Sequence, residues 1–346
     1  MANSPLLDDE KLPETVSFGE IDVSSLAETA REFARQSAAE HTQTAYSSDW
    51  RHFLSWCRRK GFDPLPPSPQ IVGLYIADCA APSTPAAKAL SVSTIERRLS
   101  GIGWNFTQRG FQFDRSDRHV SSVLAGIRRT LGRPPIQKEA LIADELLSMI
   151  DTLAYNLRGL RDRAILLIAY AGGLRRSEVV GLNVRLEDIE EGGHGWVHVV
   201  SDGAILRFRS KTGWREVAIG RGSSERSCPV AALEKWMAFA RIERGPIFRP
   251  ILKDGKTVDV ERLSSKHVAR LVKQTAEAAG VRGDLSSTER SLAFAGHSLR
   301  AGLASSANVD ERHVQKQLGH ASVEMTRRYQ RSRDRFKINL TKAAGL

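Results

Sequence analysis

The chain has 346 residues, of which 41% are hydrophobic and 26% charged, and its formal net charge at pH 7 is +11. This length and composition suit a globular chain with two domains, and the excess of lysine and arginine favours a polyanionic partner. The sequence has no apolar run of about 18 residues, which argues against a membrane span, and its first residues lack the pattern of a secretory signal.

The three cysteines, Cys57, Cys79 and Cys228, lie far apart in the sequence. None belongs to a CxxC pair or to a Cys/His cluster with zinc-ligand spacing. We therefore expect no structural zinc site and no disulfide bonds, which suits a reducing cytosol. The sequence predicts a cytoplasmic protein.

The N-terminal segment differs from the rest of the chain in its charge. Residues 1–40 contain nine acidic and three basic side chains, so the remainder is more basic than the total suggests. Residues 1–24 are acidic, contain proline and serine, and show no clear periodicity. We expect them to form a disordered tail.

Residues 25–130 show helical patterns. Apolar residues recur at i, i+3 and i+4, as in Tyr46, Trp50, Phe53 and Leu54. The expected helices cover residues 25–38, 41–61, 71–80, 92–110 and 120–132. The pattern predicts an independent bundle of four or five helices.

Residues 131–141, LGRPPIQKEAL, interrupt this pattern with two prolines and two basic side chains. Such a composition favours an extended linker. Residues 142–346 then form a second domain, in which three short segments alternate with period two and predict strands at 195–203, 204–210 and 214–220. The expected fold is mainly α with a small antiparallel β-sheet, in two domains.

Several polar residues in this second domain have the chemistry of a phosphate site. They are Arg175 in GGLRRSE, Lys211 in RSKTGWRE, His297 and Arg300 in GHSLR, and His320 and Tyr329 in LGHASVEMTRRY. Arginines can bind non-bridging phosphate oxygens bidentately. A lysine or histidine can move a proton, and a tyrosine can act as a nucleophile. The set suits metal-free attack on a phosphodiester.

Taken singly, each of these residues also has a structural interpretation. Arg175 could be a surface arginine at a helix start, Lys211 an exposed turn lysine, and Tyr329 an ordinary tyrosine on a basic helix face. The combination is more specific. LGHxSxxxTxxY, with His320 and Tyr329 nine residues apart, follows the HxxR arginine, and GLRxSE lies far upstream.

This order and wording resemble the tyrosine recombinase (phage integrase) family, which includes Cre and the Xer proteins. The resemblance covers residues 142–335 closely and the N-terminal helices more loosely. It implies a two-domain architecture in which residues 25–130 are a SAM-like core-binding domain and residues 142–346 the catalytic domain. It also implies a bacterial or phage-encoded protein associated with the nucleoid.

The resemblance implies a role for each site residue. Tyr329 attacks the scissile phosphate and forms a 3′-phosphotyrosyl bond, and Arg175 and Arg300 stabilise the transition state. Lys211 protonates the leaving 5′-oxygen, with Lys253 and Lys256 as competing candidates. His297 accepts the tyrosine proton, His320 hydrogen-bonds the phosphate, and Glu178 orients the site. No metal ion, cofactor or ATP is expected, because the cationic side chains supply the charge that magnesium supplies in nucleases.

The implied partner is double-stranded DNA with inverted-repeat target sites, on which a homotetramer exchanges strands through a Holliday junction. Accessory proteins are a further expected partner in such reactions, and the membrane is not. The residues expected to bind DNA outside the active site are basic side chains of both domains. They are Arg97, Arg98, Arg109, Lys266, His267, Arg270 and Lys273.

Two alternatives remain open at this point. One is an enzyme like a type IB topoisomerase, which shares the chemistry but relaxes supercoils. The other is a catalytically inactive DNA-binding accessory protein. The C-terminal segment, with Phe336, Ile338, Leu340 and Leu346, could dock on a neighbouring protomer or fray.

Overall fold

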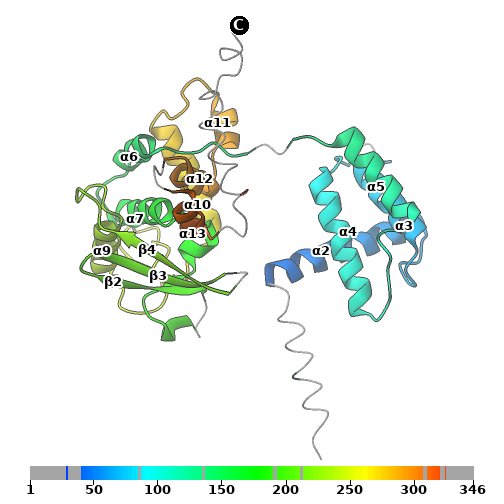
Figure 1. Cartoon of the computed structure of the whole chain (residues 1–346), viewed down its shortest axis with the longest axis horizontal. Helices are drawn as coiled ribbons and strands as arrows, with labels where there is room; N and C mark the ends of the chain where they lie inside the picture. The colour runs from blue at the N-terminus through cyan, green and yellow to red at the C-terminus, as the bar shows by residue number, and fades with distance from the viewer. Residues whose placement is uncertain are drawn as a thin grey trace, which may run out of the picture. The chain divides into compact units, whose positions relative to one another are not determined.

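The computed structural model describes residues 29, 40–84, 87–134, 137–189, 193–210, 213–306, 310–319 and 324. The chain divides into two compact units, residues 1–134 and 135–346 (Figure 1). Each unit has its own cluster of buried apolar side chains.

The first unit consists of helices, as the periodicity predicts. Its described elements are α2 (Glu40–Lys60), α3 (Pro69–Ala80), α4 (Val92–Gln108) and α5 (Arg118–Leu131). Helix α2 packs on α4, and α3 packs on α5. Serine and aspartate side chains cap the first backbone N–H groups of three helices: Ser68 for α3, Ser91 for α4 and Asp117 for α5. The predicted helix at 25–38 lies outside the described residues except for Thr29.

The core of the first unit is aromatic. Trp50, Phe53, Trp56, Tyr75 and Phe106 are buried in it and make several edge-to-face contacts, including Phe53 with Tyr75 at a centroid distance of 5.1 Å. Such pairs add to the free energy gained by burial alone. The spacing of the apolar residues in α2 is explained by this core, because α2 contributes three of the five rings.

The second unit begins with α6 (Ala143–Asp151), α7 (Leu157–Ala171) and the short α8 (Arg176–Val180). Helix α7 is the central helix, because every residue from Ala164 to Ala169 is buried. It packs against α9 (Pro229–Phe239) and α12 (Gly296–Ser306). A helix that is apolar on all sides is typical of the interior of a domain.

The sheet has four strands in the order β1 (Leu182–Asn183), β2 (Gly195–Val200), β3 (Gly203–Ser210) and β4 (Gly213–Gly220). The three predicted strands are present and pair antiparallel. The two-residue β1 was not predicted, since it is too short for an alternating pattern, and it pairs in parallel with β2, so the sheet is mixed. A 3-10 turn, η1 (Glu187–Ile189), lies between β1 and β2.

The remaining described elements of the second unit are helices. They are α10 (Ser265–Ala278), α11 (Ser287–Ala293), α12 and α13 (Glu311–Leu318). Figure 1 shows α10, α12 and α13 grouped on one side of the sheet strands. No helix in the described ranges is long and apolar enough to cross a membrane.

One end of the predicted linker joins the second unit. The backbone N–H of Glu139 donates to the carbonyl of Ala293, and that of Leu141 donates to the carbonyl of Ser298, at 3.0 and 3.1 Å. Residues 139–141 are therefore attached to α11 and α12. These hydrogen bonds make residues 139–141 part of the second unit, although they precede α6.

Candidate active site

Arg175 lies at the start of α8, directly after the turn that ends α7. The positive φ of Gly173, 55°, gives this turn its sharp change of direction. Buried Glu178 accepts two hydrogen bonds from Arg175, one from the backbone N–H at 2.8 Å and one from Nη1 at 2.6 Å. The Arg175 side chain is still 45% exposed. Glu178 therefore fixes the direction of a guanidinium that solvent can reach.

Arg300 lies on α12 and is only 1% exposed. Its Nη1 donates to the carbonyl of Gly173 and its Nη2 donates to the carbonyl of Leu318, both at 2.6 Å. Gly173 precedes Arg175 by two residues, and Leu318 ends α13. Arg300 therefore ties α12 both to the turn that carries Arg175 and to the end of α13.

His297 lies one turn before Arg300 on the same helix, as the HxxR spacing predicts. Burial lowers the pKa of His297 below its ordinary value, and the positive charges of Arg300 and Arg175 lower it further. A lowered pKa keeps the imidazole neutral near pH 7, so that it can accept a proton. Arg175, His297 and Arg300, which are far apart in the sequence, are thus brought together.

A further arginine, Arg215 on β4, belongs to the same cluster and was missed by sequence reasoning. Its Nη1 lies 3.6 Å from Oε1 of Glu178, and its side chain is only 10% exposed. The signal was present in the strand WREVAIG, where Arg215 occupies the inward face together with Val217 and Ile219, both buried. A charged residue at an inward strand position is itself a sign of a functional or paired group.

Three of the expected catalytic residues, Lys211, His320 and Tyr329, lie outside the described residues. Lys211 falls in the connection between β3 and β4, which is the predicted hairpin. Gly319 directly precedes His320 and ends α13 as its C-cap in the left-handed conformation, with φ 61°. The competing lysines, Lys253 and Lys256, are both exposed.

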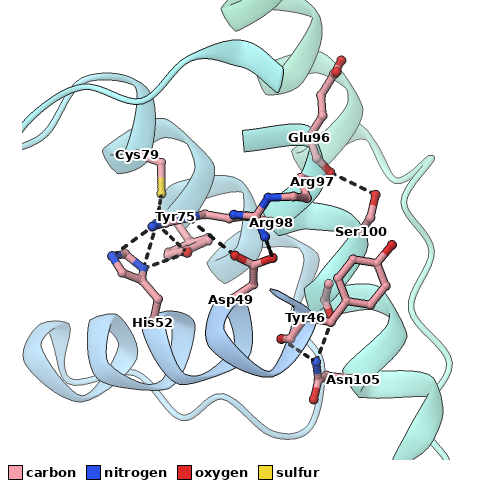
Figure 2. A network of polar contacts seen from close by, with 11 residues as sticks. Tyr46, Asp49, His52, Tyr75, Cys79, Glu96, Arg97, Arg98, Ser100 and Asn105 are labelled. Carbon is pink, nitrogen blue, oxygen red and sulfur yellow. Dashed lines mark hydrogen bonds and ion pairs between the residues drawn. The ribbon is translucent and has the colours of Figure 1, made fainter. Parts of the chain in front are cut away.

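Arg98, expected to bind DNA, is instead engaged within the first unit (Figure 2). Its Nη1 donates to Tyr75 Oη at 3.2 Å and approaches His52 Nδ1 at 2.9 Å, and its Nε lies 3.9 Å from Asp49. The side chain is 15% exposed. This geometry favours a structural role for Arg98. Neighbouring Arg97 also pairs with Asp49, but its side chain is 45% exposed.

The remaining DNA-binding candidates also differ in exposure. Lys266 and Arg270 are exposed on α10, and Lys273 on the same helix is half-buried. His267 points to α7 instead, where its Nε2 lies 3.2 Å from Asp162 and 3.0 Å from Arg161. The expected basic face of α10 is therefore formed by its lysines and Arg270, and His267 connects the helix to the core.

In the first unit, Arg109 is exposed and its guanidinium stacks on Trp50, 4.5 Å from the ring centroid. As for metal ligands, the described part of the chain has no group of three or more His, Cys, Asp or Glu side chains that could hold a metal ion.

Comparison with known proteins identifies the family. The phage integrase family model matches residues 139–335, which include Arg175, Arg215, His297 and Arg300. The chain therefore belongs to the phage integrase family, and it is a tyrosine-type site-specific recombinase.

A similar curated relative is an integrase/recombinase XerD homolog of Selenomonas ruminantium, 33% identical over 326 residues, which covers 90% of this chain and 87% of the relative. Among solved structures, a lambda integrase tetramer bound to a Holliday junction covers 92% of this chain and 80% of that chain, with TM-score 0.52 and 20% identity. The Tn1549 transposon integrase in complex with transposon right end DNA covers 88% and 92%, with TM-score 0.54 and 16% identity. These structures share the fold.

Proposed function

We propose that this chain cleaves and rejoins DNA strands through a covalent 3′-phosphotyrosyl intermediate formed by Tyr329. The observation that carries the proposal is the convergence of Arg175, His297 and Arg300 at the turn between α7 and α8. Two guanidinium groups beside one neutral imidazole suit an in-line displacement at phosphorus. Preorganised cations of this kind stabilise the charge that develops in the transition state.

The proposed step is balanced without a metal ion. The phenol oxygen of Tyr329 attacks the phosphorus, and its proton passes to His297. The bond from phosphorus to the 5′-oxygen breaks, and Lys211 gives that oxygen a proton. Arg175 and Arg300 bind the non-bridging oxygens, and a guanidinium has five N–H donors, which allows Arg300 to brace the turn as well. His320 hydrogen-bonds the phosphate.

Rejoining reverses this chemistry. The 5′-hydroxyl of a partner strand attacks the phosphotyrosine, so the energy of the original phosphodiester is kept. Four protomers on two DNA sites then exchange strands in pairs through a Holliday junction. The bound junction in the related lambda integrase tetramer supports this part of the proposal. The partner is double-stranded DNA with inverted-repeat sites, and accessory proteins could direct the outcome.

We further propose that both units bind the same DNA duplex. The core-binding domain would be residues 25–130, the linker residues 131–141 and the catalytic domain residues 142–346. Arg97 and Arg109 would contact phosphates from the first domain, and the basic face of α10 from the second. Phosphate contacts position the protein, and base contacts then select the sequence.

The test is covalent capture of DNA. Wild-type protein and its Tyr329→Phe variant are incubated with fragments of host DNA and denatured, and the attached DNA is sequenced. We expect the wild type alone to retain DNA, enriched in one short inverted repeat, while both proteins bind DNA before denaturation. Attachment without sequence preference would favour a topoisomerase-like enzyme, and binding without attachment would favour an inactive DNA-binding protein.

A further inference from the structure

Arg215 occupies a position that links three parts of the site. It lies on the inner face of β4, where its guanidinium carbon is 4.8 Å from the centroid of the buried Phe208 ring. Its Nη2 donates to the carbonyl of Gln317 at 2.7 Å, and its Nη1 lies 3.6 Å from Glu178. Strand β4 is thereby joined to α8 on one side and to the end of α13 on the other.

The contact with α13 continues to Gly319. A Cβ added to Gly319 would lie 2.8 Å from both Cδ and Nη1 of Arg215 and 3.0 Å from Nε. The arginine therefore packs directly against the residue that precedes His320. A side chain at position 319 would have to displace it.

Burial of the charged Arg215 side chain costs more free energy than a role in packing alone would explain. Burial lowers the pKa of Arg215, the negative charge of Glu178 opposes that shift, and the positive charge of Arg175 adds to it. Its Nε and Nη1 make no hydrogen bond to any described residue. Buried polar atoms are normally satisfied, and a buried cation that is not costs stability. Functional sites are where such costs are commonly found.

We propose that Arg215 is a positioning residue of the recombination site. Through Glu178 it holds Arg175 in place, and through Gln317 and Gly319 it holds the segment that leads into His320. The inference rests on the phosphate-binding roles proposed above for Arg175 and His320. Arginine is needed here because its planar fork hydrogen-bonds Gln317 and pairs with the charge of Glu178 while it stacks on Phe208, which the point charge of lysine cannot do.

The experiment compares Arg215→Met and Arg215→Lys with the control Arg207→Met. Arg207 lies on β3 of the same sheet, where it forms an exposed ion pair with Glu216. Each protein is saturated with a nicked form of the DNA recovered by covalent capture, and the rate of covalent complex formation is measured. DNA affinity and melting temperature are measured in parallel.

We expect both Arg215 variants to bind DNA within about threefold of wild type and to form the covalent complex roughly 10- to 100-fold more slowly, as expected for a misplaced catalytic group. Arg215→Lys should recover only part of the rate, and Arg207→Met should match wild type. Wild-type rates in both Arg215 variants would overturn the inference. So would a fall in rate that is fully explained by lost DNA binding or by unfolding at the assay temperature.

A second pair of variants tests the contact from the other side without changing Arg215. Gly319→Ala places a methyl group against Arg215, whereas Gly280→Ala has a similar positive φ, 69° against 61°, with no atom within 4 Å. Both alanines carry the same backbone strain. Slow cleavage by Gly319→Ala alone is the expected result, and equal rates for the two variants would contradict the proposed contact.

The two proposals can fail separately. Cleavage by wild type with unimpaired Arg215 variants would remove the inference and leave the proposed function intact. Absence of cleavage by wild type, under conditions where it binds DNA, would remove the proposed function and the inference with it.

Discussion

Three arginines of the site show how burial decides what the same side chain does. Arg175 is 45% exposed and its direction is set by Glu178, so it suits contact with a substrate. Arg300 is buried and braces two turns through their carbonyl groups. Arg215 is only 10% exposed, and it joins strand β4 to α8 through Glu178 and to α13 through Gln317. All three are the same residue type, and the difference in their roles arises from the neighbours of each side chain.

The lowered pKa of His297 leads to a prediction for the dependence of cleavage on pH. Protonation below this pKa would prevent His297 from accepting the phenol proton of Tyr329. Because the pKa lies below the ordinary value of about 6.5, activity should be full at pH 7 and fall only at more acidic pH. The measurement is the rate of covalent complex formation between about pH 5 and 8, with DNA saturating throughout.

The variant His297→Gln separates this residue from other titrating groups. We expect its rate to be about 100-fold or more lower than that of wild type at pH 7, with no further fall toward acidic pH. An acid limb that persists unchanged in the glutamine variant would assign the titration to another group. Retained DNA affinity is the control that the variant is folded.

At the scale of elements, close helix packing in the first unit depends on missing side chains. Helix α3 approaches the start of α5 at Gly73, where a Cβ would lie 2.4 Å from the carbonyl oxygen of His119. Gly126 is also helical, in α5, but no atom lies within 4 Å of its Cβ position. Gly73 is therefore required for close packing of the two helices, whereas position 126 has space for a methyl group.

We predict that Gly73→Ala destabilises the protein by about 1–3 kcal/mol, because the helices must move apart or strain. Gly126→Ala should be neutral or stabilise it by up to about 1 kcal/mol, since alanine has the higher helix propensity. Urea denaturation followed by tryptophan fluorescence measures both. Equal midpoints for the two variants would mean that α3 and α5 are not packed as closely as described.

Apolar periodicity predicts some of the helices and strands of this protein but not others. The four described helices of the first unit and the three antiparallel strands of the second follow the predicted patterns. Helix α11 and strand β1 were not predicted, because seven and two residues give too few repeats to define a period. The catalytic roles of Lys211, His320 and Tyr329 stay predictions, since those residues lie outside the described part of the chain.

At the scale of the whole molecule, the net charge of +11 predicts binding to DNA that weakens strongly with salt. The exposed residues Lys266 and Arg270 on α10 are the proposed phosphate contacts of the second unit. Lys235 on α9 pairs with Glu225 at 2.6 Å and is a charge-matched control. Comparison of these residues separates a local contact from the effect of total charge.

We predict that Lys266→Gln and Arg270→Gln each lower the slope of log affinity against log salt by about 0.9. Lys235→Gln removes the same charge but should leave the slope unchanged. Fluorescence anisotropy of labelled DNA at several salt concentrations gives the slopes. A similar decrease for all three variants would show that α10 has no specific contact and that only net charge matters.

The sequence by itself determined the class of protein, because the identity and order of the motifs around Arg175, Arg300 and Tyr329 are local and could be read directly. It also determined most elements, since apolar periodicity reflects which face of each helix or strand is buried. Only the tertiary structure decided which basic residues are engaged in contacts within the protein. Arg98 pairs inside a helical core, His267 pairs with Asp162, and Arg215 joins α8 to α13. Asp162 lies 105 residues from His267, and Gln317 lies 102 residues from Arg215. Such pairings depend on how whole elements pack rather than on any local pattern.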